Sequence, residues 1–509
     1  MAGVDATSLT AGEWLGRAKQ AWEADEPRAA LAAAWTAFDL APRERASKAF
    51  LAMLLEQRQN DLPDSRRDGF LRLLTDREVE PNRIAKTGWR WVLRRYPIPD
   101  PVDDSALVAA LTAFERDDLV LALLREAPVC LVEAERILSR LRCYLLLSGC
   151  WRAYPQVVNA LKAQIALNGG AWPFNTDERH ALMAAEAEAM VAAYLPVGDR
   201  EVGSLRPELS PTDRITPAVR AQYETWPYPA WTRVTLDTPR RLPDTIAALD
   251  VDVAAALPVK AAMLVAGCGT GRQAAYVASQ YPDATVTAID ISEASLDYGR
   301  RQCAALGIAN VRFLRLDLHR IAELGRRFHA IHSAGVLHHV ANPERGLKLL
   351  ADVLEPGGVM HLMLYNRHQR LMVNGAKALL MADLLHEPVS DDLLRRVRQR
   401  FLDRPDHPAA AYVMRSRDFF TLAGAHDLLL HRHEDPFDLP RLDRALAAAG
   451  LLLLSFDMPT PAVAARYRAM FPHDPKRRDI KSFDRFETHD PAVMHGHYRF
   501  WCYLPNARD

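Results

Sequence analysis

The feature that most constrains the fold is a change in hydrophobic patterning after Pro258. From there on, short runs of β-branched and aliphatic residues alternate with segments of helical periodicity. Such alternation is typical of a doubly wound parallel sheet, in which a helix follows each strand and covers one face. We therefore predict an α/β, seven-stranded Rossmann-like sheet, with strands at 261–267, 284–290, 311–317, 329–335, 358–365, 451–457 and 498–504.

Two connections depart from simple alternation. The fifth and sixth strands are separated by far more chain than a crossover helix needs, and long insertions at this edge of a sheet are typically lids or binding walls. We therefore predict an inserted substrate-lid region at 366–437. The sixth and seventh strands show no clear full helix between them, apart from a short candidate starting at Pro461. This connection suits a last strand that is inserted antiparallel.

Residues 1–200 predict an all-helical N-terminal domain, because alanine and leucine recur at helical spacing and glycine is sparse. Residues 13–42 partly fit a single tetratricopeptide repeat, although Arg17 occupies a usual leucine position. An ordinary alanine-rich helix pair explains the same stretch. Residues 196–220, which contain several prolines and glycines, are predicted to be a linker. Further helices are expected at 105–127, 131–149, 154–168 and 176–194.

Composition excludes several classes of partner and compartment. Lys+Arg and Asp+Glu both number 64, so no overall field indicates nucleic acid or an anionic membrane. No apolar run approaches the length of a membrane helix, and the first residues do not form a secretory signal. The six cysteines are scattered without a CxxC pair. We therefore expect reduced thiols and a cytoplasmic location, with no membrane or nucleic-acid partner.

A glycine-rich loop follows the first predicted strand. Gly267-Cys268-Gly269-Thr270-Gly271 leads into a helix, where glycines permit tight turns and the helix N-terminus offers free N–H groups. Asp290 ends the second strand, 19 residues after Gly271, and is placed to bind ribose hydroxyls. Asp317 ends the third strand, where a carboxylate can take an adenine amino group. Together these strand ends predict an adenosine-binding site.

These motifs resemble the class I S-adenosylmethionine (SAM)-dependent methyltransferase family. VAGCGTG is similar to its first motif, AIDIS to its second, and SAGVLHHVANPERGL with LEPGGVM to later ones. The run after the fourth strand argues against the structural alternative, a nicotinamide-dependent enzyme. One position departs from the family: Val265 stands where an acidic residue usually helps to hold the amino group of SAM.

The resemblance implies SAM as the cofactor and assigns residues to its parts. It places the methionine end at the glycine loop, the ribose at Asp290 and the adenine at Asp317. The full set of cofactor-binding residues that we expect from the domain at 251–509 is Gly267, Cys268, Gly269, Gly271, Asp290, Ile291, Asp317, Leu318 and Ala334, with Ile291 and Leu318 on the adenine faces.

A second resemblance involves residues 222–231, QYETWPYPAW, within the predicted linker and lid at 201–250. It is similar to the QYExxPYPxW element of bacterial methyltransferases that carry an N-terminal helical, often tetratricopeptide, region. We predict a rigid aromatic lid whose rings face the sulfonium, because π-faces attract cations. Tyr223 and Tyr228 are accordingly expected to bind the cofactor. Alternatively, these rings with Trp226 and Trp231 only attach the linker to the sheet.

Candidate catalytic residues are His338 and His339, which with Tyr365 and Asn366 follow the fourth and fifth strands, where the acceptor must lie. A structural role for either histidine is an equal alternative, because a base is needed only for a nucleophile that carries a proton. The run His431 to Asp435 contains two histidines that would share a face of a strand. It matches no complete ligand set, so we predict no metal site there.

The inserted region contains one further pattern. Leu394, Val397 and Phe401 form an apolar helical stripe. The arginines around it predict either a solvated basic face or a wall that binds an anionic acceptor; they are Arg395, Arg396, Arg398 and Arg400.

Together, the sequence predicts a cytoplasmic SAM-dependent methyltransferase acting on N or O of an unidentified acceptor. The helical region would recruit a protein or peptide, or shape one wall of the site. Two other hypotheses remain. The chain could be a non-catalytic SAM-binding scaffold or regulator, for which Val265 is the sole support, or the helices could serve only as an interaction module for oligomerisation.

Overall fold

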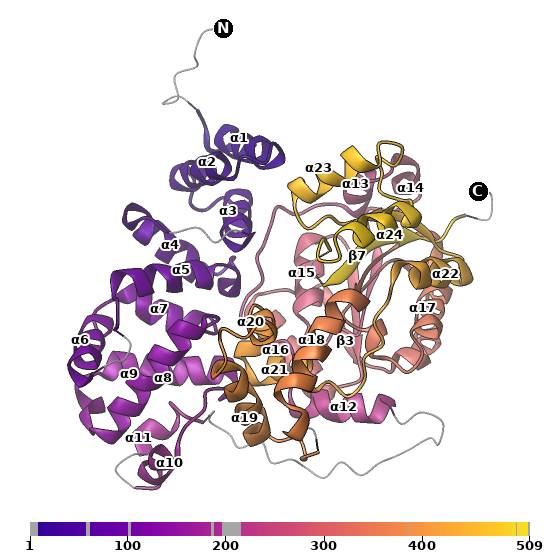
Figure 1. Ribbon diagram of the computed structural model, residues 1–509. Coiled ribbons are helices and arrows are strands. Elements are labelled where there is room, and N and C mark those ends of the chain that lie inside the picture. The colour runs from indigo at the N-terminus through magenta and orange to yellow at the C-terminus, as the bar shows by residue number, and fades with distance from the viewer. Residues whose placement is uncertain are drawn as a thin grey trace.

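The computed structural model describes residues 9–57, 62–99, 103–184, 188–195, 215–384, 386–494 and 496–506. An N-terminal helical region lies beside an α/β region (Figure 1). Most of the predicted linker, 196–214, is outside the described residues. Within the described residues, every helix is too short or too polar to cross a membrane.

The N-terminal region is helical, as predicted. Its elements are α1 (Ala11–Glu23), α2 (Pro27–Leu40), α3 (Arg45–Gln57), η2 (Asp64–Arg66), α4 (Arg67–Thr75), α5 (Pro81–Arg95), α6 (Asp104–Phe114), α7 (Asp118–Glu126), α8 (Val132–Leu147), η3 (Cys150–Ala153), α9 (Pro155–Asn168), α10 (Thr176–Leu182) and α11 (Glu188–Val191).

Two predicted N-terminal helices are interrupted: 176–194 contains α10, which ends at Leu182, and α11, and 105–127 contains α6 and α7. Asp117 separates α6 from α7, and its side chain accepts hydrogen bonds from the backbone of Leu119 and Val120. A carboxylate in this capping position satisfies N–H groups at the start of a new helix, so the chain turns there. α1 and α2 pack against each other as a helix–turn–helix, and their relationship to a tetratricopeptide repeat stays a prediction.

The seven predicted strands are confirmed and form one sheet. Its order is β3-β2-β1-β4-β5-β7-β6. β7 pairs antiparallel with both β5 and β6, as the connection suggested, whereas the other pairs are parallel. The strands are β1 (Ala262–Ala266), β2 (Thr285–Asp290), β3 (Val311–Arg315), β4 (Phe328–Ala334), β5 (Leu354–Tyr365), β6 (Leu452–Phe456) and β7 (His497–Tyr503).

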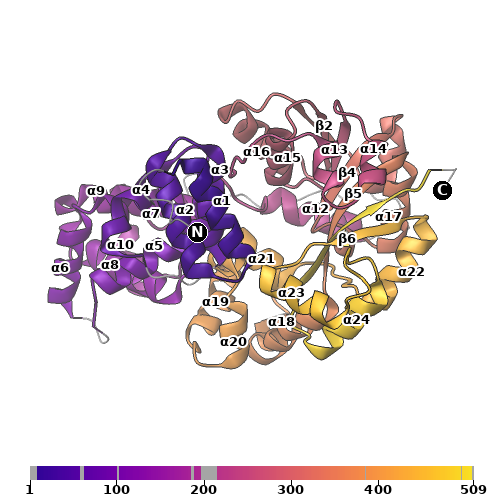
Figure 2. The same cartoon turned by 90° about the horizontal axis from the view of Figure 1, so that it is seen from above.

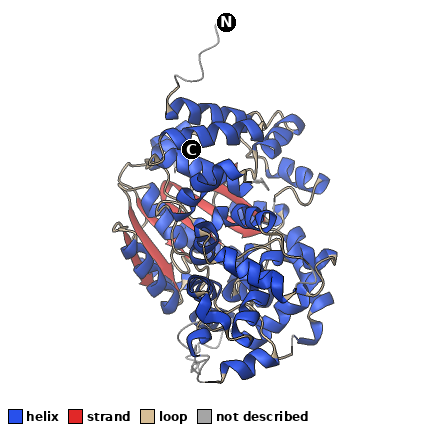
Figure 3. Ribbon diagram, turned by 90° about the vertical axis from the view of Figure 1, so that its left-hand side faces the viewer, coloured by secondary structure: helices blue, strands red, loops and turns tan. Residues whose placement is uncertain are grey.

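Helices cover both faces of this sheet (Figure 3). Residues of α13 to α16 pack into the core of one face, and residues of α17, α22 and α24 into the core of the other. The helical elements of this region are α12 (Ile215–Thr225), α13 (Leu242–Ala247), α14 (Val251–Ala255), α15 (Arg272–Gln280), α16 (Glu293–Ala305), η5 (Leu318–Leu324), η6 (Leu337–His339), α17 (Pro343–Asp352), α18 (Arg367–Leu380), η7 (Ala382–Leu384), α19 (Asp391–Leu402), α20 (Pro408–Val413), η8 (Arg417–Phe420), α21 (Leu422–Leu430), α22 (Leu439–Ala449), α23 (Pro461–Met470) and α24 (Ile480–His489).

The connection between β6 and β7 contains two helices: α23, which is the short candidate starting at Pro461, and α24, which the sequence analysis did not predict. Ile480, Phe483 and Phe486 of α24 are buried against the sheet. Their spacing of three residues is helical, so the signal was present in the sequence and was missed.

The insertion, residues 366–437, packs against the N-terminal helices (Figure 2). Arg398 is fully buried, and its Nη2 donates to both carboxylate oxygens of Glu135 of α8, at 2.9 and 2.8 Å. The Arg395 Nε donates to the carbonyl of Gly170 at 2.7 Å. The predicted solvated face and the predicted anion wall are therefore both wrong for these two arginines. Arg396 and Arg400 are more exposed and pair with acidic residues of the insertion itself.

Candidate active site

The glycine loop after β1 is shaped by steric contacts. Gly267, Gly269 and Gly271 all have positive φ, at 66°, 51° and 80°, which other residues rarely adopt. A Cβ at Gly267 would lie 2.4 Å from a methyl of Val336, and one at Gly269 would lie 2.8 Å from the carbonyl oxygen of Tyr228. The backbone of the 222–231 segment thus lies directly over the loop, which leaves no room for a side chain.

Asp290, at the end of β2, is buried beside this loop. Its Oδ2 accepts from the N–H of Gly269 at 2.7 Å and its Oδ1 from the N–H of Ser292 at 2.9 Å. Burial raises the pKa of this carboxyl. Each carboxylate oxygen has a second lone pair, so Asp290 can still accept two ribose hydroxyls. This geometry fits the adenosine expected from the sequence.

A cavity of about 770 Å³ opens at this edge of the sheet. Gly271 is the one predicted cofactor residue outside its lining; it caps α15, and a Cβ there would lie 2.8 Å from Phe313. Asp317 lies beyond the end of β3 and caps η5. The predicted residues that line the cavity are Tyr223, Tyr228, Gly267, Cys268, Gly269, Asp290, Ile291, Asp317, Leu318 and Ala334.

The aromatic segment, residues 222–231, contains both cavity-lining rings and rings that pack elsewhere. Tyr223 and Tyr228 line the cavity. Trp226 instead stacks on His426, with ring centroids 4.4 Å apart, and Trp231 donates from its Nε1 to the carbonyl of Thr270 at 2.9 Å. Two rings thus face the cavity, and the two tryptophans attach the segment to its surroundings.

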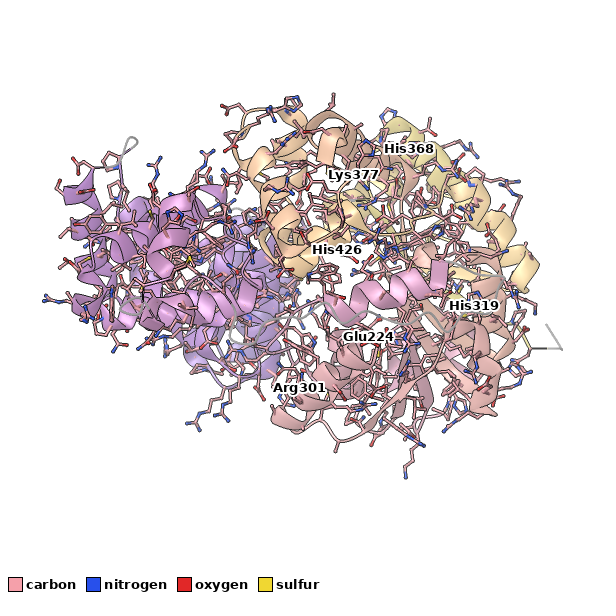
Figure 4. All side chains as sticks on the ribbon, turned by 90° about the horizontal axis from the view of Figure 1, so that it is seen from below. Glu224, Arg301, His319, His368, Lys377 and His426 are labelled. Carbon is pink, nitrogen blue, oxygen red and sulfur yellow. The ribbon has the colours of Figure 1, made fainter. Side chains whose placement is uncertain are left out.

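α12 leads into this segment and is held against α16. The carboxylate of Glu224 accepts from the backbone N–H groups of Glu293 and Ala294, at 2.9 and 3.1 Å, and so caps α16. Figure 4 shows α12, which carries Glu224, crossing beneath the insertion, which carries His426. Because α12 is bonded to α16 through Glu224 and to the insertion through Tyr223, the position of Tyr223 is fixed.

Two aspartates of the insertion hold the two cavity tyrosines. The Tyr223 hydroxyl donates to Asp427 Oδ1 at 2.8 Å, and the Tyr228 hydroxyl donates to Asp418 Oδ1 at 2.7 Å. Asp427 also lines the cavity. Burial, together with the nearby Asp418 and Glu434 carboxylates, raises the pKa of Asp427 to about 7. Sequence reasoning missed this carboxylate.

The structure separates the two candidate histidines. His339 lines the cavity; its Nδ1 donates to the carbonyl of His433 at 2.9 Å, and burial lowers its pKa to about 3. His338 is absent from the cavity lining among the described residues. Its ring stacks on Tyr365, with centroids 3.8 Å apart, and its Nδ1 accepts from the Tyr365 N–H at 3.1 Å. His338 therefore supports Tyr365 from behind.

His339, Asp427 and His431 each place one ligand-type atom within 4.8 Å of the others. The hydrogen bonds already in place oppose a metal at this point. The N–H of His433 donates to His431 Nδ1 at 3.0 Å, so the neutral His431 ring carries its proton on Nε2. That Nε2 faces the Tyr223 hydroxyl at 3.2 Å and donates to it. The lone pair that a metal requires is thus not available on Nε2.

The N-terminal helices form part of the cavity wall. Glu56, Glu80 and Arg83 line it together with Arg272 and Arg417 of the α/β region. Arg272 donates to both oxygens of Glu80, at 3.0 and 2.7 Å, and Arg417 donates to Glu56 at 2.7 Å. These ion pairs hold the helical region against the mouth of the cofactor site.

A row of side chains on the sheet itself extends the cavity. His332, His361 and Trp501 are neighbours across β4, β5 and β7, and all three line the cavity. His361 stacks on Trp501 at 4.5 Å and its Nε2 lies 2.9 Å from Asp457. The sequence analysis did not predict this row. The signal was present in β5, because His361, Met363 and Tyr365 alternate along the strand and therefore lie on one face of the sheet.

Comparison with known proteins assigns part of the chain to a family. Residues 263–358 match the family described as "Methyltransferase domain". This chain contains a class I SAM-dependent methyltransferase domain. SAM is the cofactor of this domain, in agreement with the fit of Asp290 and the glycine loop.

The relatives of the methyltransferase domain have diverse names. An uncharacterized protein from Synechococcus sp. is 32% identical over 213 residues, covering 38% of this chain and 48% of that protein. The tRNA 5-carboxymethoxyuridine methyltransferase of Escherichia coli K12 is 29% identical over 185 residues, covering 35% of this chain and 68% of the enzyme. The trans-aconitate 2-methyltransferase of Deinococcus radiodurans is 35% identical over 102 residues, covering 20% and 37%. The chain therefore spans about half the length of the first relative and about a third of the last.

A solved structure is also similar to this chain. It is PKMT2 from Rickettsia typhi in complex with AdoHcy, with a TM-score of 0.39 and 18% identity, covering 53% of this chain and 54% of that one.

Proposed function

We propose that this protein transfers the methyl group of SAM to a nitrogen or oxygen of an acceptor that binds between the helical region and the sheet. The observation that carries this proposal is the continuity of one cavity, which runs from Asp290 to Glu56 and Glu80 of the N-terminal helices. The helical region is then a wall of the active site, as one of the sequence hypotheses held.

Bound SAM supplies a methyl group on a positively charged sulfur. A nucleophile that approaches the methyl carbon in line with the carbon–sulfur bond can displace the sulfur. The chain contributes mainly position, which accounts for much of the acceleration in such reactions. Asp290 holds the ribose, and the glycine loop admits the methionine end under the backbone of Tyr228. The rings of Tyr223 and Tyr228 face the cavity, where they exclude water and attract positive charge.

The geometry also ranks the candidate bases. His339 reaches the cavity, but burial lowers its pKa to about 3, which makes its neutral ring a weak base. His338 stands behind Tyr365. Asp427 reaches the cavity and its pKa of about 7 lies near working pH, where a general base is most effective.

The test is transfer of a labelled methyl group. Purified protein is incubated with methyl-labelled SAM and fractionated cell lysate, with Asp290→Ala as the control. We expect label in at least one fraction with the wild-type protein and much less label with the variant at the same SAM concentration. SAM binding without transfer to any fraction would refute the proposal and favour the scaffold alternative, whose sequence support is Val265, a residue in the core of the sheet.

A further inference from the structure

We propose that Asp427 is the catalytic base and that the acceptor is a protonated amine, which Asp427 binds and deprotonates. This inference rests on the methyl transfer proposed above and names the substrate class of the same site. It is based on the amine-binding chamber, which we define as Tyr223, Tyr228, Tyr365, His339 and Asp427, all of which line the cavity. Tyr223 contacts Asp427, and His339 lies beside Tyr365.

The charges around this chamber favour a cation. Asp418 and Glu434 interact with Asp427, as does Arg370, which is paired with Glu434 through its Nε at 2.6 Å. Lys377 interacts with Glu434 in turn. Asp290 acts on Tyr223, and Arg272 acts on Tyr228. Four carboxylates thus face three cations, and burial keeps His338, His339 and His431 neutral by lowering the pKa of each.

The walls of the chamber add to this preference. Three tyrosine side chains line it, and the faces of such rings attract ammonium groups. An acceptor carboxylate would instead lie against Asp427, and like charges in a buried site repel strongly. The chamber is therefore better matched to an ammonium group than to a carboxylate.

Asp427 is held in place with one oxygen left for a ligand. Among the described residues, the only hydrogen bond to its carboxylate comes from Tyr223, to Oδ1. His431 donates to the same tyrosine hydroxyl, so the tyrosine proton must point to Asp427. Tyr223 and His431 are thus positioning residues, and Oδ2 of Asp427 is left to accept a proton from the acceptor.

The reaction balances with the groups present. The Asp427 carboxylate takes one proton from the ammonium, which leaves a neutral amine with a free electron pair. The amine nitrogen bonds to the methyl carbon as the carbon–sulfur bond breaks, and that bond's electron pair stays on sulfur. The products are a methylammonium and S-adenosylhomocysteine. Asp427 releases its proton to water as the products leave.

The acceptor class can be tested by the chemistry of the label. Wild-type protein, methyl-labelled SAM and lysate are used, before and after the lysate amines have been blocked by acetylation. We expect label that survives strong alkali and disappears on acetylation. Label that alkali releases as methanol, or that acetylation leaves unchanged, would overturn the amine assignment while the transfer itself stands. Absence of any transfer would instead refute the proposed function.

The base is tested with Asp427→Asn. Loss of a general base should lower kcat by about 100-fold or more, while calorimetry should give a SAM affinity within about twofold of wild type. Wild-type kcat/KM, which reports the free enzyme, should rise with pH through about 7, where Asp427 ionises. In the variant, the rise should continue toward the ordinary pKa of an amine, about 10.

The matched control is Glu178→Gln. Glu178 is also a buried carboxylate that accepts from a tyrosine hydroxyl, that of Tyr194 at 2.7 Å, and it lies in the N-terminal region away from the cavity lining. The kcat of the Glu178→Gln variant and its pH profile should match those of the wild-type protein. Three results would overturn the assignment: an unchanged pH profile in Asp427→Asn, a SAM affinity at least tenfold weaker, or activity of wild type that EDTA abolishes and zinc restores.

Discussion

Replacing Asp427 with Asn should stabilise the ligand-free protein by an amount that grows as the pH rises toward about 7 and then stays constant. The native pKa of Asp427 is about 7, against an ordinary value of 3.8, because burial disfavours the charged form. Between these values the unfolded chain is ionised while the native carboxyl keeps its proton, so rising pH favours unfolding. A shift of about 3 units at ~1.36 kcal/mol each gives a penalty of about 4 kcal/mol above pH 7.

The assay is denaturant unfolding of wild type and Asp427→Asn without SAM, at intervals from pH 5 to 8.5. The difference between the two proteins cancels the other titrating groups. About two thirds of the penalty, roughly 2.5 kcal/mol, should appear in this window, since part of it has already developed below pH 5. A difference that is constant or that falls as pH rises would refute the reasoning.

Asp250→Asn is a control of opposite sign. Hydrogen bonds from Arg478 and Lys476 lower the pKa of Asp250. The stability that Asp250 contributes is therefore present above pH 3.8 and is lost as the pH falls below it. The variant should be less stable than wild type at pH 7, and the deficit should shrink on acidification.

Three further predictions concern the docking of the helices, the cofactor and the aromatic segment. Arg398→Met should lower the free energy of unfolding by about 3–5 kcal/mol, because Glu135 is left buried without its partner, and adding Glu135→Leu should recover much of this loss. Arg396→Gln, at an exposed pair, should cost less than about 1 kcal/mol. Equal thermal shifts for the two single variants would contradict this. Asp290→Ala should weaken SAM binding at least about tenfold in calorimetry, because two ribose hydroxyls lose their acceptor, and unchanged affinity would place the cofactor elsewhere. SAM should slow hydrogen exchange in residues 222–231 more than in α1 to α9, and equal protection would mean that the segment serves only as an attachment.

The sequence predicts most of the fold because the fold depends on local patterns. Hydrophobic alternation locates every strand of the sheet, and the spacing from Gly271 to Asp290 identifies the ribose acceptor. These signals depend on residues close together in the chain. The long connection between β5 and β6, which indicates an insertion, is equally visible in the sequence. The elements against which the insertion packs are not visible there.

The missed features depend on contacts between distant segments. Asp427 meets Tyr223 across 204 residues, and Arg398 meets Glu135 across 263. Helical periodicity correctly places Val397 in the core, but it does not show which element covers the neighbouring face of the helix. For the same reason the sequence predicts solvent-facing or anion-binding arginines on α19, whereas two of them join the insertion to the N-terminal helices.

The central claim is that SAM and the acceptor meet at Asp427. Its most direct test is a crystal structure with S-adenosylhomocysteine. A nucleophile lies about 3.5 Å from the methyl carbon, and a base lies about 3 Å from the nucleophile. With the carbon–sulfur bond included, the account predicts an Asp427 oxygen within about 8 Å of the sulfur and the ribose on Asp290. A sulfur that faces away from Asp427, or a ribose bound elsewhere, would contradict it.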